Sequence, residues 1–136
     1  MASLSPACRR LFDEPRLGHV ATVGPDGAPQ LSAVWVDLDG DDLVFGTQRG
    51  NVKCRNLRRD PRLTVSVEGD PGGFLQPHVV ARGRAVIEEI GPEVWLERMD
   101  RLSERYTGAP FPMRAGGDAG VWIRMTVEKV TETGTG

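Results

Sequence analysis

The stretch from Phe45 to Arg62, FGTQRGNVKCRNLRRDPR, gathers the side chains of this 136-residue chain that are best suited to hold an anion. A strand is predicted to end at Thr47, and a short helix is predicted to begin at Asn51. Lys53 then falls in the first helical turn, with Arg55 beside it. The first turn of a helix presents unpaired backbone N–H groups and a positive partial charge. A hydroxyl, an ammonium and a guanidinium at that end would complement a phosphate group.

Two other interpretations of this stretch stay open from the residues alone. A run of basic side chains is most often a solvated surface. It could also contact nucleic acid, but the chain has a formal net charge of −2, and no aromatic residues are interleaved with the arginines for base stacking. We therefore expect a small-molecule ligand and no nucleic-acid partner.

Motifs for other kinds of chemistry are missing from the sequence. Cys8 and Cys54 are far apart, and His19 and His78 are the two histidines, so no metal site is expected. No P-loop, G-x-S-x-G or G-x-G-x-x-G motif occurs, and no catalytic acid, base or nucleophile can be named. No apolar run approaches the roughly 20 residues of a membrane span, and the N-terminus does not resemble a signal peptide. We expect a soluble, cytoplasmic protein with no membrane partner.

The elements that position this stretch are predicted from periodicity and turn residues, and they indicate one domain over residues 1–136. Six antiparallel strands with short helices predict a mainly β fold, a small barrel, with a frayed tail from Thr131. The strands are predicted at Leu17–Val23, Gln30–Leu38, Leu43–Thr47, Leu63–Val67, His78–Glu88 and Val121–Val127, and the helices at Ser5–Phe12, Asn51–Arg58 and Glu93–Tyr106.

The predicted strand Gln30–Leu38 is apolar on both faces. An antiparallel strand with one buried face should alternate between apolar and polar residues. In a barrel the inner face of the strand packs in the core, so its outer face needs another partner. A homodimer is the simplest source of that partner.

The segments GPDGAPQLSAVW, DGDDLVFGTQRGNVKCRNLRRDPRLTVSV and VVARGRAVIEE resemble the pyridoxamine 5′-phosphate oxidase-like split β-barrel family. Within it, the chain is most similar to the actinobacterial branch of deazaflavin (F420)-dependent oxidoreductases. The resemblance implies a six-stranded antiparallel split barrel, as in FMN-binding relatives, and a homodimer with cofactor sites in grooves between subunits. Position 52 is Val52 where the oxidases proper carry arginine, and their C-terminal extension is missing, so vitamin B6 oxidation is disfavoured.

The resemblance also implies cofactor-binding roles for particular residues. Phosphate contacts are implied for Lys53, Thr47 and Arg55, and Arg49 is a candidate for the acidic tail of F420. The cofactor ring would lie along the backbone of the strand residues Ser32, Ala33, Val34 and Trp35. His78 matches a position where relatives contact the cofactor with a polar side chain from the opposite subunit.

The function expected from this resemblance is hydride transfer between F420 and an unsaturated small molecule, with the loop Ala109–Gly120 lining the substrate pocket. One alternative keeps the fold and replaces F420 with FMN. Another, of a different class, is a non-catalytic carrier of a flavin, F420, haem or another tetrapyrrole. The sequence identifies neither the substrate nor a catalytic residue.

Overall fold

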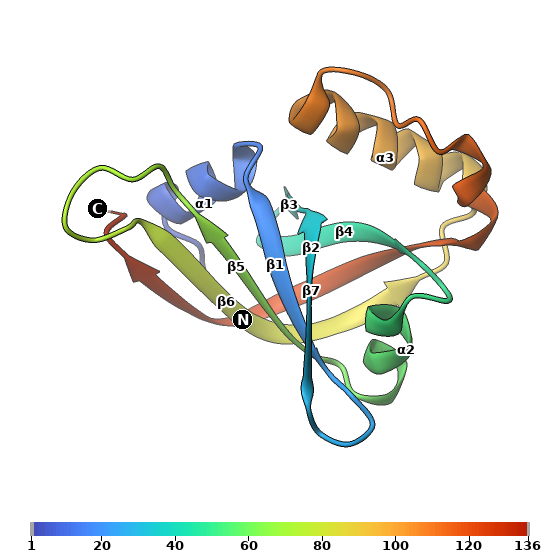
Figure 1. The fold of residues 1–136 in the computed structure, drawn as a ribbon, viewed down its shortest axis with the longest axis horizontal. Coiled ribbons are helices and arrows are strands. Elements are labelled where there is room, and N and C mark those ends of the chain that lie inside the picture. The colour runs from blue at the N-terminus through green and yellow to red at the C-terminus, as the bar shows by residue number, and fades with distance from the viewer. Residues whose placement is uncertain (1, 136) are drawn as a thin grey trace.

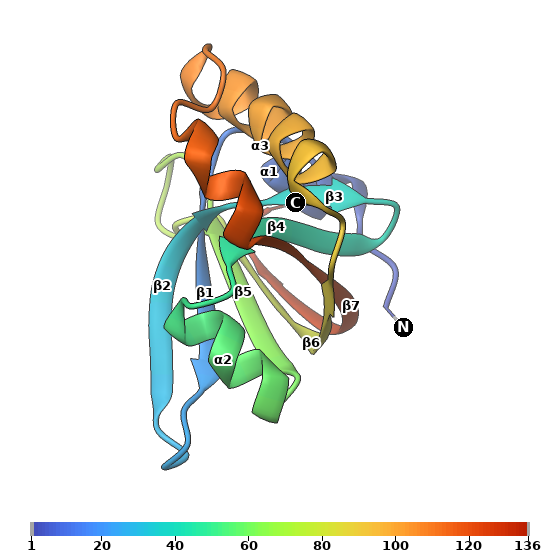
Figure 2. The ribbon, with the colours of Figure 1, turned by 90° about the vertical axis from the view of Figure 1, so that its right-hand side faces the viewer.

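Seven antiparallel strands form one curled sheet in the order β2-β1-β5-β6-β7-β4-β3 (Figure 1). The computed structural model describes residues 2–135. Figure 2 shows the sheet as an open half-barrel with α3 above it and α2 below. The elements are α1 (Pro6–Asp13), β1 (Leu17–Val23), β2 (Pro29–Trp35), β3 (Asp37–Asp39), β4 (Asp42–Gln48), α2 (Val52–Arg59), β5 (Arg62–Glu68), β6 (His78–Glu88), α3 (Pro92–Thr107), η1 (Arg114–Ala119) and β7 (Gly120–Thr133).

The mainly β split-barrel class is confirmed, but the predicted count of six strands is wrong. The predicted strand Gln30–Leu38 breaks at Val36 into β2 and the short β3. The N–H of Val36 donates to the hydroxyl of Tyr106 at 3.1 Å, and that hydroxyl donates to the carbonyl of Arg16 at 2.6 Å. The backbone N–H of Val36 is therefore bonded to a side chain of α3 and not to another strand, and β3 pairs with β4 instead of continuing β2.

The strand β7 is longer than its apolar pattern predicts. Its predicted part ends at Val127, but pairing with β6 continues to Thr133, which lies opposite His78. Composition predicts fraying from Thr131, yet the long β6 offers backbone partners that the composition of the tail does not reveal. No helix within residues 2–135 is long and apolar enough to cross a membrane.

Two apolar clusters fill the space on the two sides of the sheet. The larger cluster lies inside the curl and includes Leu63, Val65 and Val67, which alternate along β5 as their spacing predicts. The smaller cluster lies between β4, β7 and α3, and includes Val44, Trp95 and other apolar residues of those elements. The sheet thus carries a helix on part of its outer face, which creates a second interior beside the barrel.

Gly83 marks an irregularity in β6, as an interior strand glycine predicts. The register between β6 and β7 shifts at Arg82 and Gly83. A Cβ atom at Gly83 would lie 1.9 Å from the carbonyl oxygen of Thr126. The two strands approach so closely here that only glycine fits.

Replacing Gly83 with alanine should therefore destabilise the fold. We expect Gly83→Ala to lower the free energy of unfolding by about 3 kcal/mol, because the methyl group must displace backbone. Gly72→Ala is the matched control, since a Cβ there meets no atom within 4 Å. Denaturant titration of both variants measures the difference, and equal stabilities would contradict the close approach.

Candidate functional site

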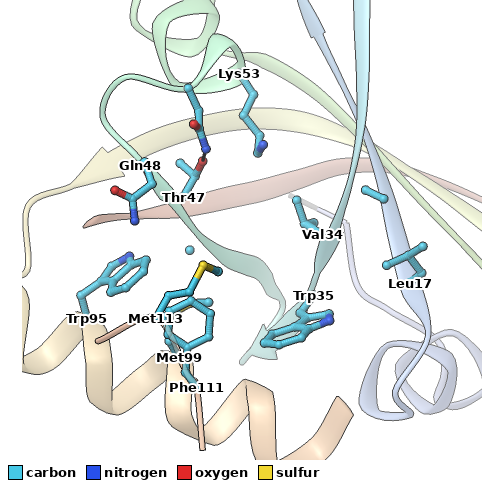
Figure 3. Close-up of a pocket in the computed structure, with 13 residues that line it drawn as sticks. Leu17, Val34, Trp35, Thr47, Gln48, Lys53, Trp95, Met99, Phe111 and Met113 are labelled. Carbon is cyan, nitrogen blue, oxygen red and sulfur yellow. Dashed lines mark hydrogen bonds between the residues drawn. The ribbon is translucent and has the colours of Figure 1, made fainter. Parts of the chain in front are cut away.

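A cavity of about 310 Å³ lies between β2 and β4, at the open side of the half-barrel. Residues from β2, β4, α2, α3 and the segment after α3 line it, so every layer of the fold contributes. The lining residues, most of them labelled in Figure 3, are Leu17, Ala33, Val34, Trp35, Gly46, Thr47, Gln48, Asn51, Lys53, Trp95, Met99, Phe111 and Met113.

The polar end of the cavity is built where β4 passes into α2. Thr47 is buried, and its hydroxyl accepts a hydrogen bond from the side-chain amide of Asn51 at 2.9 Å. Asn51 occupies the N-cap position of α2, as predicted, but its side chain makes no capping bond to the helix. The backbone N–H groups at the start of α2 therefore donate no hydrogen bond to the Asn51 side chain, and they lie beside Lys53 in the same turn.

Lys53 places a cation in the cavity without a matching carboxylate. Figure 3 shows its side chain reaching from α2 toward Val34 on β2. Burial lowers the pKa of the Lys53 ammonium, and no ion pair to it is formed within residues 2–135. A partly desolvated cation without a counter-ion is unfavourable by itself, and an anionic ligand would relieve that cost.

The other end of the cavity is aromatic. Trp35 stacks on Tyr106 with ring centroids 5.5 Å apart, and Phe111 meets Trp35 edge-on at 6.2 Å. The indole N–H of Trp95 donates to the carbonyl of Val121 at 3.0 Å, which fixes the ring beside the cavity. Such a surface suits the flat face of a ring system.

Five of the nine residues proposed from the sequence are brought together by the fold. They line the cavity from two strands and one helix, with the apolar group on β2 facing the polar group near α2. These five are Ala33, Val34, Trp35, Thr47 and Lys53.

The other four do not line the cavity of their own chain. Ser32 lies on β2 with a buried hydroxyl that has no hydrogen-bond partner. The guanidinium of Arg49 binds the Glu89 carboxylate at 2.5 Å. Arg55 is exposed on α2, two positions from Lys53 and so on another face of the helix. His78 begins β6, and its Nδ1 contacts the carbonyl of Gln76 at 2.8 Å.

Several lining residues were not among the sequence candidates. On α3, Trp95, Met99, Leu102 and Tyr106 recur at intervals of four, three and four residues. This helical spacing correctly identifies Trp95 and Met99 as buried, but it does not show that the same face borders a cavity. The segment Ala109–Gly120 was expected to line a pocket, and its Phe111 and Met113 do so. Gln48 and Leu17 carry no sequence signal that distinguishes them from ordinary strand residues.

The chemistry available in the cavity is binding rather than acid–base catalysis. Lys53 is the one ionisable side chain among the described lining residues. Within residues 2–135, no group of three or more His, Cys, Asp or Glu side chains could hold a metal ion. The site therefore suits an anionic ligand with a ring, and a reaction performed on that ligand would need chemistry supplied by the ligand itself.

Known proteins with this architecture were compared with the chain. A protein named F420 reductase is 29% identical, covers 90% of this chain and 94% of its own, and superimposes with a TM-score of 0.77. A conserved hypothetical protein from Mycobacterium tuberculosis is also 29% identical, with coverage of 96% and 84% and a TM-score of 0.79. HutZ, a haem storage protein from Vibrio cholerae, has a TM-score of 0.74 over 99% and 98% of the chains, but its 18% identity shows the fold alone.

The family assignment rests on nearly the whole chain. The F420 reductase at 29% identity supports the F420 branch that the sequence motifs indicate. A sequence model of the pyridoxamine 5′-phosphate oxidase family matches residues 4–134. The chain therefore belongs to the pyridoxamine 5′-phosphate oxidase family of split β-barrel proteins.

Proposed function

We propose that the protein is an oxidoreductase that binds F420 in the cavity between β2 and β4 and transfers a hydride between it and an unsaturated small molecule. The observation that carries this proposal is the half-buried Lys53 ammonium, which faces an aromatic-walled cavity and has no carboxylate partner within residues 2–135. Membership of the family and the 29% identity to an F420 reductase support the choice of cofactor.

The residues present fit a phosphorylated, ring-bearing cofactor. Lys53, the hydroxyl of Thr47 and the first amides of α2 would hold the phosphate. Gly46 lets Met99 of α3 pack directly on β4 at the cavity, because a Cβ at Gly46 would lie 2.5 Å from the sulfur of Met99. The free edge of β2 would offer backbone polar groups to the rim of the ring, since alternate residues of an edge strand point their backbone N–H and C=O groups away from the sheet.

The roles of the chain in this reaction are binding, orientation and exclusion of water. The bound deazaflavin supplies the hydride chemistry. Lys53 fixes the cofactor at one end, and Trp35 and Phe111 limit the space over the ring at the other. Among the described lining residues of one subunit, Lys53 is the one ionisable side chain, and it lies at the end of the cavity proposed for the phosphate.

We further propose that the active form is a homodimer. Leu17 and Leu31 are 50% and 68% exposed, and both point to the outer face of the β1–β2 pair. In the ladder between these strands, Leu17 is paired with Trp35 and Leu31 is paired with Ala21. Leu17 also lines the cavity, so this apolar face is continuous with the cavity rim. A second copy on this face would bury Leu31 and close the rim. His78, which lies outside the cavity of its own chain, is proposed to reach the site of the partner.

An acidic side chain in this face should separate the subunits. Leu31→Glu should turn a dimer into a monomer at micromolar concentration, because an interface of on the order of 2,000 Å² cannot bury an unpaired carboxylate. Val86→Glu is the control, since Val86 is 59% exposed on another part of the sheet. Sedimentation velocity measures both. A wild-type monomer, or a dimeric Leu31→Glu, would contradict the proposed interface.

Removing the Lys53 charge should have opposite effects on stability and on binding. Burial lowers the pKa of Lys53, so the folded chain holds its protonated form less readily than the unfolded chain does. At neutral pH we expect Lys53→Met to raise the melting temperature of the ligand-free protein and to weaken F420 binding by about one to two decades. The F420 affinity of the wild type should also fall as pH rises through the lowered pKa of Lys53.

The control for this charge is Lys129→Met, because Lys129 is the other lysine of the chain and is exposed on β7. Calorimetry and fluorescence titration measure the two effects. If Lys53→Met lowered the melting temperature, or left F420 affinity unchanged, the phosphate would not be held by this ammonium.

The preference for F420 over FMN should depend on exposed cations near α2. F420 carries carboxylates beyond the phosphate, whereas FMN ends there, so F420 should bind more tightly, and the preference should shrink as salt rises. Arg55 is the first candidate because it forms no ion pair within residues 2–135, whereas Arg49 would have to leave Glu89. Arg55→Gln should weaken F420 binding more than FMN binding, and Arg49→Gln should do so less.

Titration of both cofactors into the wild type and these variants decides between the cofactors. Tighter binding of FMN, or equal losses for both ligands, would reassign the cofactor to FMN. Reoxidation of bound, reduced F420 by an added quinone such as menadione distinguishes an enzyme from a carrier, which would retain the reduced cofactor.

A further inference from the structure

Residues 109–119, here called the arm, connect α3 to β7 and form one wall of the cavity. Phe111 of the arm is buried, and its ring lies edge-on to Trp35 and Trp95 with centroids 6.2 and 5.7 Å away. Met113 also lines the cavity, although it is 65% exposed. Figure 3 shows both side chains at the end of the cavity away from Lys53.

The carboxylate of Asp100, on α3, fixes the first half of the arm. Its Oδ1 accepts the backbone N–H of Phe111 at 2.9 Å and the Nη1 of Arg114 at 2.5 Å. The same Nη1 donates to the carbonyl of Phe111 at 3.2 Å. Both backbone polar groups of Phe111 are thus held by one carboxylate–guanidinium pair. This pairing also keeps the pKa of Asp100 below its ordinary value, mainly through the hydrogen bond from Arg114, so the carboxylate is ionised at neutral pH.

The second half of the arm is fixed from the other side of the cavity. Arg49, at the end of β4, donates to the carbonyl of Asp118 at 2.6 Å and also binds Glu89. The backbone N–H of Arg49 donates to the carbonyl of Ala119 at 2.8 Å. The arm is therefore attached at both ends, and Met113 lies within the first attachment, between Phe111 and Arg114.

We propose that Asp100 is a positioning residue for a second ligand: it sets Phe111 and Met113 as a wall against which a neutral, apolar ring compound binds. The side chains at this end are aromatic or thioether groups, and the cation lies at the other end. A charged ligand would lose hydration here without gaining a partner. A neutral ring would pack against the aromatic groups, and the flexible Met113 side chain would adapt to its shape.

The role of this compound rests on the proposed function, in which it is the hydride acceptor beside the cofactor ring. The binding itself does not depend on that function, because the wall belongs to this chain alone. Asp100 does not line the cavity, so it acts through the backbone of Phe111. Removal of its carboxylate leaves the Phe111 N–H and the Arg114 guanidinium without this partner, which frees the arm to move.

The test uses the full-length protein and N-phenyl-1-naphthylamine, a neutral ring compound whose fluorescence rises in apolar surroundings. Asp100→Ala should weaken binding of this probe roughly tenfold, the effect of losing one charge-assisted hydrogen bond. Asp100→Asn keeps an acceptor for the Phe111 N–H and should lose less. Met113→Ala should also weaken binding, and Glu97→Ala, which removes an exposed carboxylate from the same helix, should not.

Two further measurements separate positioning from general structure. Hydrogen exchange at the Phe111 amide should accelerate in Asp100→Ala and stay close to wild type in Asp100→Asn. The affinity for F420 should fall less than the affinity for the probe in Asp100→Ala and Met113→Ala, because Lys53 still holds the other end of the cofactor, while the KM for menadione with reduced F420 should rise in Asp100→Ala. If Asp100→Ala fails to fold, Arg114→Gln carries the same comparison, because it removes the other half of the pair that holds Phe111.

Three results would overturn the proposal. The first is an unchanged probe affinity in a variant whose Phe111 amide exchanges hydrogen faster. The second is an unchanged probe affinity in Met113→Ala, and the third is an equal loss of probe and F420 affinity in Asp100→Ala. A wild-type protein that binds the probe but not F420 would instead refute the proposed function and leave the comparison of probe affinities intact.

Discussion

The gap between β2 and β4 is the constraint on which the site depends. Hydrogen bonding runs from β2 around the sheet to β3, and within residues 2–135 no ladder joins β2 to β4. A closed barrel would have satisfied both edges with backbone bonds and would have left no opening between β2 and β4. Because the edges stay apart, side chains from α2, α3 and residues 109–119 line the gap, and their different chemistry gives it one cationic end and one aromatic end.

The aromatic end exists because α3 approaches the sheet unusually closely. A Cβ at Gly120 would lie 2.3 Å from the indole of Trp95, and one at Gly46 would lie 2.5 Å from the sulfur of Met99. Both glycines are required by space rather than by a left-handed backbone, since neither has a positive φ. With Trp95 also bonded to Val121, the helix is held at a distance where its inner face packs on β4 and β7 and borders the cavity at the same time.

Local patterns in the sequence predict much of this arrangement. The alternation of apolar residues in β5, the irregularity at Gly83 in β6 and the N-cap of α1 at Ser5 each depend on neighbouring residues, so local sequence is enough to predict them. The break at Val36 is not predictable in this way, because it depends on the hydroxyl of Tyr106, 70 residues later. Trp95 on the cavity wall is missed for the same reason: spacing shows that a face is buried, but not which surface buries it.

Arg49 and Lys53 show why the types of residues and their spacing in the sequence could not identify the site completely. Arg49 and Lys53 are four residues apart and equally basic in the sequence. In the fold Arg49 meets Glu89 and the carbonyl of Asp118, two partners supplied by distant segments, and its charge is used to join them. Lys53 meets no carboxylate in the described part of the chain and is partly desolvated, so its charge destabilises the ligand-free fold. Because the Lys53 charge is not neutralised within the fold, it remains available to attract an incoming anion. This difference between Lys53 and Arg49 exists only in the folded chain.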